Sequence, residues 1–359
     1  MRVALLITDL HPGGAPLRIA RLARGLRDSG VEVHVGSLAP PGRVGDELRA
    51  HGVPVFTANA RGIADIGAFP RLRRELRRIQ PDVLHSTLFH ANVAARLVGR
   101  SLGVPVLTST ATIEVERPWH ILLERLTVGW DCGQIVNSDA LAGHVRDRIG
   151  VGEDRIFRVP IGVEAGKSVS RETALRELGL APGPFRIAWA GRMDPVKRVE
   201  LLIAALRKPA LQQAELLLIG DGPRRAEWQR LAENLGVSRR VHWLGWRDSP
   251  RTPIAAADLF ALPSRTEGLP NAVLDAMAAG VPVVASDIPA TRELVGVPAR
   301  LRLVSAPSAW AEALAQIRDE KAERERLAAA AREWIEAECQ PAKMVAAHVA
   351  IYQRVIGRP

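Results

Sequence analysis

The sequence predicts an α/β protein made of two doubly wound parallel-sheet domains that face a cleft. The chain has 359 residues, of which 47% are hydrophobic and 25% charged, and these fractions are typical of globular proteins rather than of disordered or fibrous ones. This length suits two domains that each bury a core. Short apolar runs alternate with longer amphipathic stretches in two successive series, which is the pattern of parallel sheets covered by helices on both faces.

The first series begins at the N-terminus. The apolar run 3–7 predicts a buried strand, the periodicity of 17–29 predicts a helix, and 31–36 predicts the next strand. Further strands are predicted at 82–85, 105–109, 134–137 and 156–160. We therefore expect a first domain over residues 1–164.

The second series starts after a break at 164–171, where Gly166, Lys167 and Ser168 interrupt the pattern. Strands are predicted at 186–190, 215–219, 241–244, 259–262 and 281–286, and helices at 199–207, 224–235 and 271–279. Beyond residue 308 the chain is almost wholly helix-forming. We expect a second domain over 165–336, and a C-terminal helix in 337–359 that packs back toward the first domain.

The net charge of +10 favours anionic partners, which include phosphate-bearing small molecules, anionic membranes and nucleic acid. Because there is no known nucleic-acid motif, and few aromatic residues for base stacking, we expect no nucleic acid partner. The arginine-rich run 71–78 has two interpretations, a face that contacts anionic lipid or a solvated helix surface. A second apolar segment contains Trp119, Trp130 and the run 121–123, and it forms either an acceptor pocket or part of the core.

Location is indicated by what the sequence lacks. Cys132 and Cys339 are the two cysteines, too few for a disulfide framework or a thiol metal site, which favours a reducing cytoplasm. No apolar run approaches the roughly 18 residues of a membrane span. We expect a cytoplasmic protein, with peripheral contact at the inner face of the membrane as an alternative to a freely diffusing one.

The most informative motif is the stretch 263–282, where a strand ends and a helix begins at about Pro270. Free amides at a helix start suit a phosphate group. Glu267 lies in the preceding loop and Asp275 one helical turn inside. Carboxylates repel phosphate but accept hydrogen bonds from sugar hydroxyls. A nucleotide sugar therefore suits this stretch, because its phosphates match the free amides and its hydroxyls match the carboxylates. The alternative is a solvated loop glutamate and a helix-surface acid.

Two further loops follow predicted strands. Gly191 opens a loop that carries Arg192 and Lys197, whose charges suit a diphosphate, although exposed loop cations are common. Gly13 and Gly14 follow the first strand without the three-glycine dinucleotide fingerprint. They predict either close backbone approach to a ligand or a plain turn.

Together these motifs resemble the GT-B glycosyltransferases, specifically the retaining family four, over most of the chain. The matching pieces are Gly13-Gly14-Ala15, 82–85, Asn137-Ser138, 159–163, Gly191-Arg192 with Lys197, 220–223, Leu244-Gly245 and 267–271. The resemblance implies two Rossmann-like domains, the first with the acceptor site and the second with the nucleotide-diphosphate sugar. It favours a UDP-sugar over a GDP-sugar as co-substrate.

The resemblance also implies roles for individual residues. Arg192 and Lys197 would contact the diphosphate and stabilise its charge as it leaves, and Glu267 would bind the sugar hydroxyls, so these three form the catalytic set. Asp275 would bind the ribose, and Gly14 would approach the donor from the first domain. The remaining donor-binding residues implied are Gly191, Gly245, Trp246, Arg247, Gly268, Leu269, Pro270 and Asn271.

The implied reaction is transfer of a hexose to an acceptor hydroxyl with retention, with no obligatory metal or cofactor because protein cations cover the phosphates. Such a reaction serves polysaccharide, glycolipid or glycoside biosynthesis, with a glycan, lipid-linked or small-molecule acceptor. The alternatives are a silent nucleotide-sugar-binding scaffold for a partner transferase, and a phosphorylase or epimerase on the same architecture.

Three departures from the family pattern concern the site. Asp275 stands where relatives have a second glutamate, and Thr110 and Thr112 stand in a loop where many relatives have a histidine. In the glycine loop, Pro16 and Leu17 stand where a glutamate and an arginine are frequent. His85 and His90 are further acceptor-side candidates, with a structural role as the alternative.

Overall fold

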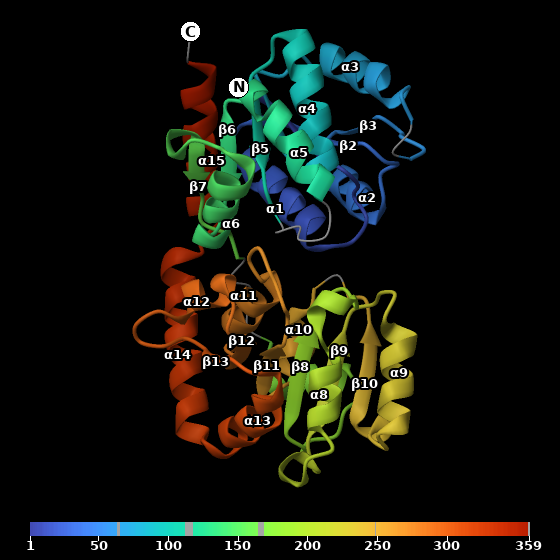
Figure 1. Cartoon of the computed structure of the whole chain (residues 1–359), viewed down its shortest axis with the longest axis vertical. Helices are drawn as coiled ribbons and strands as arrows, with labels where there is room; N and C mark the ends of the chain where they lie inside the picture. The colour runs from blue at the N-terminus through green and yellow to red at the C-terminus, as the bar shows by residue number, and fades with distance from the viewer. Residues whose placement is uncertain (63–64, 112–117, 164–168, 248, 358–359) are drawn as a thin grey trace. The chain divides into compact units, whose positions relative to one another are not determined.

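The computed structural model describes residues 1–62, 65–111, 118–163, 169–247 and 249–357 (Figure 1). The chain forms two compact units, and we call them unit 1 (Met1–Gly162 with Pro341–Pro359) and unit 2 (Val163–Gln340). The expected boundary after residue 336 falls inside helix α14 (Lys321–Glu338), and the structure divides the chain after Gln340 instead. The expected boundary at 164/165 lies outside the described residues.

In its described residues, unit 1 contains a parallel sheet of seven strands in the order β3-β2-β1-β4-β5-β6-β7. The strands are β1 (Arg2–Ile7), β2 (Glu32–Ser37), β3 (Val55–Thr57), β4 (Val83–Thr87), β5 (Val106–Ser109), β6 (Gly133–Val136) and β7 (Ile156–Arg158). The α-helices are α1 (Gly14–Asp28), α2 (Arg43–Ala50), α3 (Ala68–Ile79), α4 (Phe89–Leu102), α5 (Pro118–Thr127), α6 (Asp139–His144) and α15 (Pro341–Ile356).

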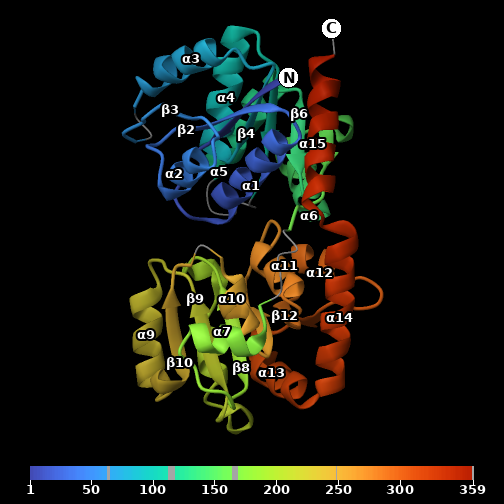
Figure 2. The same ribbon diagram turned by 180° about the vertical axis from the view of Figure 1, so that it is seen from behind.

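Both faces of the unit 1 sheet are buried, which explains why its strands read as continuous apolar runs. Along β1, Leu5 points into a core with α1 and α15, and Leu6 points into the core on the opposite face, with α3 and α4. Helix α15 lies beside α1 although more than 300 residues separate them in the chain (Figures 1 and 2). Tyr352 of α15 is fully buried in that core.

In its described residues, unit 2 contains a parallel sheet of six strands in the order β10-β9-β8-β11-β12-β13. The strands are β8 (Arg186–Ala190), β9 (Glu215–Ile219), β10 (Val241–Gly245), β11 (Leu259–Leu262), β12 (Val283–Ser286) and β13 (Arg302–Val304). The α-helices are α7 (Arg171–Glu177), α8 (Glu200–Ala205), α9 (Arg225–Asn234), α10 (Arg251–Ala255), α11 (Asn271–Ala278), α12 (Pro289–Val295), α13 (Trp310–Asp319) and α14.

The two sheets confirm the predicted class of two doubly wound, Rossmann-like parallel-sheet units. In each sheet the order of the strands reverses once, between β1 and β4 in unit 1 and between β8 and β11 in unit 2. Doubly wound domains bind ligands beyond the carboxyl ends of the strands at such a reversal. These two edges are therefore where the candidate residues matter.

Candidate functional site

The loops that follow β8 and β11 meet at the strand-order reversal of unit 2. The first loop carries Arg192 and Lys197, and the second carries Glu267. The amide of Arg265 donates a hydrogen bond to the carbonyl oxygen of Val196 at 2.8 Å, which joins the two loops. Residues 70 positions apart in the chain are thus placed at one edge of the sheet.

Lys197 and Glu267 form an ion pair across these loops. Lys197 Nζ lies 2.7 Å from Glu267 Oε1, and the two side chains are 19% and 12% exposed. Each charge is largely withdrawn from water and neutralised by the other, yet a ligand can still reach both. Arg192 on the same loop as Lys197 is exposed. The structure therefore joins Lys197 and Glu267 at this edge of the sheet, with Arg192 in the same loop as Lys197.

Helix α11 starts directly after the loop that carries Glu267. Its first helical residue is Asn271, one position after the expected Pro270, and no side chain caps its amides. Asp275, one turn further along, accepts a hydrogen bond from Arg251 Nε at 3.3 Å, from α10. Arg251 was not among the residues predicted from the sequence, because its approach to Asp275 depends on how α10 and α11 pack.

Glycines let the loops after β8, β9 and β10 approach one another closely. The amide of Gly191 donates to Ile219 O at 2.9 Å, and the amide of Gly220 donates to Gly245 O at 2.8 Å. A Cβ atom on Gly220 would lie 1.9 Å from the carbonyl oxygen of Gly191, so a side chain there would push two loops apart. These contacts hold the three loops together at the carboxyl edge of the unit 2 sheet.

The predicted base-side segment follows β10. Arg247 is exposed, and its Nε donates to Leu244 O at 3.2 Å. Trp246 is partly buried, and its indole Nε1 has no hydrogen-bond partner among the described residues. In the loop before α11, Gly268 and Pro270 are buried and Leu269 is partly buried. These residues lie at the carboxyl ends of β10 and β11, with β9 and β8 between them.

In unit 1, His85 lies inside the sheet core on β4. Its Nδ1 is 2.7 Å from the hydroxyl oxygen of Tyr352 and its Nε2 is 2.7 Å from Ser109 Oγ, so both ring nitrogens are engaged within the protein. Burial and the nearby His348 and Arg18 hold the pKa of His85 well below its ordinary range. His85 is a neutral side chain that positions Ser109 and Tyr352, with no nitrogen left for a ligand.

The other acceptor-side candidates are more dispersed. His90, in the first turn of α4, packs edge-on against Phe89 and His120, with ring centroids 5.0 and 5.4 Å apart. Thr110 Oγ1 donates to Gln134 Oε1 at 3.0 Å just beyond β5. Gly14 is exposed at the start of α1. Thr112 lies outside the described residues.

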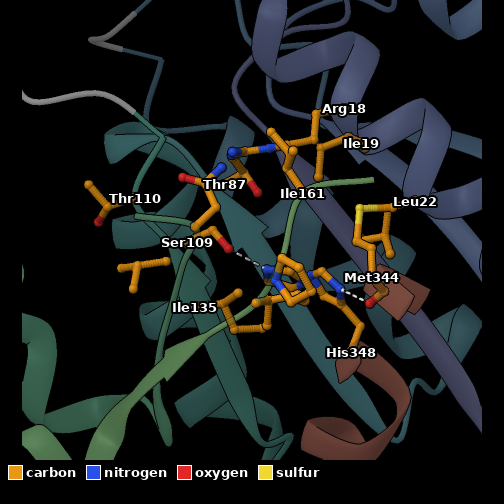
Figure 3. Close-up of a pocket in the computed structure, with 15 residues that line it drawn as sticks. Arg18, Ile19, Leu22, Thr87, Ser109, Thr110, Ile135, Ile161, Met344 and His348 are labelled. Atoms are coloured by element: carbon orange, nitrogen blue, oxygen red, sulfur yellow. Dashed lines mark hydrogen bonds between the residues drawn. The ribbon is translucent and has the colours of Figure 1, made fainter. Parts of the chain in front are cut away.

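Thr110 separates two pockets of unit 1. The first lies at the carboxyl ends of β4, β5 and β6 beside α1 and α15 (Figure 3). The second lies between α4 and α5, and Phe89, His120 and Glu124 are among the residues that line it. His85 lines the first pocket, and Thr110 lines both.

The surface of unit 1 carries an apolar patch on α4, α5 and the turn after it, which we call the α4–α5 patch. Its members are Leu97 (40% exposed), Trp119 (46%), Leu122 (58%), Leu123 (36%), Leu126 (64%) and Trp130 (37%). By contrast, the apolar residues Leu72, Leu76 and Ile79 of α3 are buried, and Arg74, Arg77 and Arg78 are exposed, an arrangement that fits either interpretation of the arginine-rich run. Among the described residues, no helix is long and apolar enough to cross a bilayer. Nor do they contain a cluster of three metal-ligating side chains.

Family comparisons cover both units. Residues 12–167 match the Glycosyltransferase Family 4 model and residues 184–320 match the Glycosyl transferases group 1 model. A D-inositol 3-phosphate glycosyltransferase of Actinosynnema mirum is 29% identical over 66% of this chain, a match that spans 64% of its own length. The lipopolysaccharide core biosynthesis glycosyltransferase LpsD of Rhizobium meliloti is 24% identical over 96% of both chains.

Among solved structures, Anabaena Alr3699/HepE in complex with UDP-glucose superposes with a TM-score of 0.85. The match has 21% identity and covers 99% of this chain and 100% of that one, so it shows the fold. The two family models match consecutive regions, one in each unit apart from a few residues, and the fold agrees with the strand order. The chain therefore belongs to the GT-B glycosyltransferases, with a family 4 region followed by a group 1 region.

Proposed function

We propose that this protein is a retaining glycosyltransferase that moves a hexose from a UDP-sugar to an acceptor hydroxyl. Unit 2 binds the donor and unit 1 binds the acceptor. The observation that carries the proposal is the Lys197–Glu267 pair at the strand-order reversal of unit 2, with Arg192 in the same loop as Lys197. The complex of Alr3699/HepE with UDP-glucose supports a uridine nucleotide and a hexose as the donor.

In the proposed reaction, Arg192 and Lys197 stabilise the negative charge that grows on the departing diphosphate. Glu267 accepts hydrogen bonds from the sugar hydroxyls, and this orients the reacting carbon. The phosphate oxygen released on the same face takes the proton of the acceptor hydroxyl, so the new bond has the configuration of the old one. Because the two cations supply the positive charge, the reaction proceeds without an obligatory metal.

The remaining donor contacts follow from the loops of unit 2. Asp275 accepts the ribose hydroxyls, with Arg251 holding its carboxylate in place. The base lies beside Gly245, Trp246 and Arg247. The unpartnered indole Nε1 of Trp246 supports a hydrogen-bond acceptor on the ligand at this position. The amides at the start of α11 face the donor phosphates or sugar.

For the acceptor, we propose a glycan, lipid-linked or small-molecule substrate in glycan or glycolipid biosynthesis at the cytoplasmic side of a membrane. The Rhizobium relative named for lipopolysaccharide core biosynthesis supports this range. We also propose a peripheral membrane contact through the α4–α5 patch, where Arg100 stacks over Trp130 at 4.9 Å, because apolar and basic side chains together suit anionic lipid.

The first experiment measures thermal unfolding with UDP, GDP, ADP and dTDP, since a ligand of the native state raises its stability. We expect the largest shift with UDP, and its loss in Arg192→Ala. Lys208→Ala, which removes an exposed lysine at the other end of α8, is the matched control and keeps the shift. Absence of any nucleotide shift in folded protein would refute the donor site.

The second experiment separates an enzyme from a silent scaffold. Release of UDP from UDP-glucose is measured with an acceptor library for the wild type and for Glu267→Gln, and the anomeric configuration of the product is read by NMR. We expect turnover to fall roughly 100-fold or more in the variant, as when one preorganised transition-state contact is lost. Binding of UDP without turnover of any acceptor would favour the scaffold, and an inverted product would contradict retention.

The membrane contact is tested by sedimentation with vesicles of phosphatidylglycerol or of phosphatidylcholine. We expect binding to phosphatidylglycerol, and its loss in the double variant Leu122→Ser, Leu126→Ser, in which both replaced side chains are exposed. The variant Arg74→Gln, Arg77→Gln at exposed positions of α3 is the control. If this control loses binding and the leucine variant does not, the contact lies on α3.

A further inference from the structure

One cation of unit 1 lines a pocket and has no counter-charge. Arg18 lies on the second turn of α1, is partly buried, and borders the pocket at the carboxyl ends of β4 to β6. Within the described parts of the chain it has neither an ion-pair partner nor a hydrogen-bond acceptor. Figure 3 shows Arg18 and Thr87 on one side of the pocket and Met344 and His348 on the other.

Most other arginines of this unit are paired. Arg21, one turn further along α1, donates to the carbonyl oxygen of Gly162 at 3.0 Å, and Arg27 lies 3.1 Å from Asp28. The fifteen residues that line the pocket include no aspartate or glutamate. The two histidines in its wall, His85 and His348, are buried. The pocket therefore has one full positive charge and no negative one.

This electrostatic environment is unfavourable for the protein alone. Burial, together with the nearby charge of Arg21, lowers the pKa of Arg18 to about 10, so it remains protonated at neutral pH. A guanidinium withdrawn from water without a partner loses solvation that a bound anion would replace. Its fork of N–H donors matches phosphate or carboxylate oxygens.

A second polar group in the same wall also lacks a partner. Asn137 follows β6, and its Oδ1 is buried without a hydrogen-bond donor in the described part of the chain. An amide oxygen repels an anion but accepts a hydroxyl proton. Arg18 and Asn137 thus select for a ligand that carries both an anionic group and a hydroxyl group.

We propose that this pocket binds the acceptor substrate, and that the acceptor is a phosphorylated sugar or polyol whose phosphate is bound by Arg18 and whose hydroxyl is bound by Asn137. The proposal rests on the proposed function in that it names the chemistry of the acceptor. It assigns Arg18 to acceptor specificity and to no step in donor binding.

The test compares Arg18→Gln with Arg27→Gln, a matched substitution at an exposed position of the same helix. Binding of glycerol 1-phosphate and inorganic phosphate is measured by calorimetry at constant ionic strength, with glycerol as the uncharged probe and UDP titrated separately. We expect wild type and Arg27→Gln to bind both phosphates, and Arg18→Gln to lose at least tenfold in affinity. Because Arg18 has no partner to lose, Arg18→Gln should melt no lower than the wild type.

The outcomes separate the two proposals. Equal phosphate binding by Arg18→Gln and wild type would overturn the anion site, even if UDP binds normally. A parallel loss of UDP binding in Arg18→Gln would assign the residue to the donor diphosphate and also overturn it. Phosphate binding that depends on Arg18, in a protein that binds no UDP, would uphold the anion site and refute the donor proposal.

Further arms distinguish the source of the phosphate and the role of Asn137. Sedimentation with phosphatidylglycerol vesicles that is lost in Arg18→Gln would identify a lipid headgroup, whereas sedimentation that it retains would identify a soluble ester. Asn137→Ala should weaken glycerol 1-phosphate severalfold and leave inorganic phosphate unchanged. An equal effect on both probes would refute the hydroxyl contact.

Discussion

The stability of unit 1 should fall as the pH falls from 7.5 to 5.0, because His348 is buried in its neutral form. The pKa of His348 is lowered to about 4, chiefly by burial; the hydrogen bond from Nδ1 to Met344 O at 2.8 Å opposes the shift, and the charge of Arg18 adds to it. His85 on β4 and Tyr352 on the same helix also face it, with ring centroids at 5.6 and 6.0 Å. No carboxylate lines this part of the pocket.

The sign follows from proton binding. In the unfolded chain a histidine has a pKa of about 6.5, so below that pH the unfolded state takes up a proton that the folded state refuses. The contribution of His348 is therefore fully present above about pH 6.5 and is lost as the pH falls toward 4. Between pH 7.5 and 5.0 the loss is about 2 kcal/mol, and it approaches about 3 kcal/mol below pH 4.

The assay is hydrogen exchange at the amides of β4 and β5, which reports the free energy of unfolding of unit 1 at each pH. Between pH 7.5 and 5.0, the free energy of unfolding should fall by about 2 kcal/mol less in His348→Gln than in the wild type. This difference does not depend on how stable the variant is at pH 7.5. Replacing the exposed His51 by Gln is the matched control and should leave the loss unchanged. Equal losses in wild type and His348→Gln, or an imidazole NMR titration of His348 centred near pH 6.5, would refute the reasoning.

Three further predictions concern the rest of the molecule. Gly220→Ala should weaken UDP binding at least tenfold because its Cβ would meet the Gly191 carbonyl, whereas Gly236→Ala, also at positive φ but with open space, should leave UDP binding intact; calorimetry distinguishes them. Arg96→Met should destabilise unit 1 by about 3–5 kcal/mol in urea unfolding, because Asp131, 2.7 Å from Arg96 Nε and 0% exposed, loses a buried partner; a loss below about 1 kcal/mol would contradict this. Turnover should survive EDTA if protein cations alone cover the diphosphate, and abolition that Mg²⁺ reverses would contradict it.

Much of the fold could be predicted from the sequence, because apolar runs separated by amphipathic stretches have few solutions other than parallel sheets. The strands that were missed are short ones. β3 (Val55–Thr57) and β13 (Arg302–Val304) have three residues each, too few to show a period, and they are defined by pairing with β2 and β12. The α4–α5 patch could not be predicted either, since exposure depends on what a helix packs against.

The two candidate sites differ in how they are encoded. In unit 2 each loop motif is contiguous in sequence, and the strand order brings Lys197 and Glu267 together, so residue types and spacing were informative. The pocket of unit 1 draws one to three residues from each of several elements: α1, β4, β5, β6, the segments after β5, β6 and β7, and α15. Arg18 lies just after the Gly13-Gly14-Ala15 motif and was not predicted as a site residue, and His348 had no local signal. Only the tertiary packing of unit 1 places Arg18 and His348 in the wall of the same pocket.

The Lys197–Glu267 pair makes a last prediction about the donor site, because a diphosphate and Glu267 compete for the same ammonium. When UDP binds, Lys197 must leave the Glu267 carboxylate, which lies 2.7 Å away, or be shared between it and the diphosphate. The binding free energy that Lys197 contributes is therefore the difference between its ion pair with the diphosphate and its ion pair with Glu267. Glu267→Gln removes the competitor and should bind UDP about three- to tenfold more tightly than the wild type, a coupling of about 1 kcal/mol. UDP-glucose should gain less or lose affinity, because Glu267 is then missing for the sugar hydroxyls. Calorimetry measures the affinity of UDP and of UDP-glucose for the wild type, Glu267→Gln, Lys197→Met and the double variant. These four proteins form a double-mutant cycle, which gives the coupling energy between Lys197 and Glu267. Weaker UDP binding by Glu267→Gln would show that the carboxylate orients Lys197 rather than competing for it.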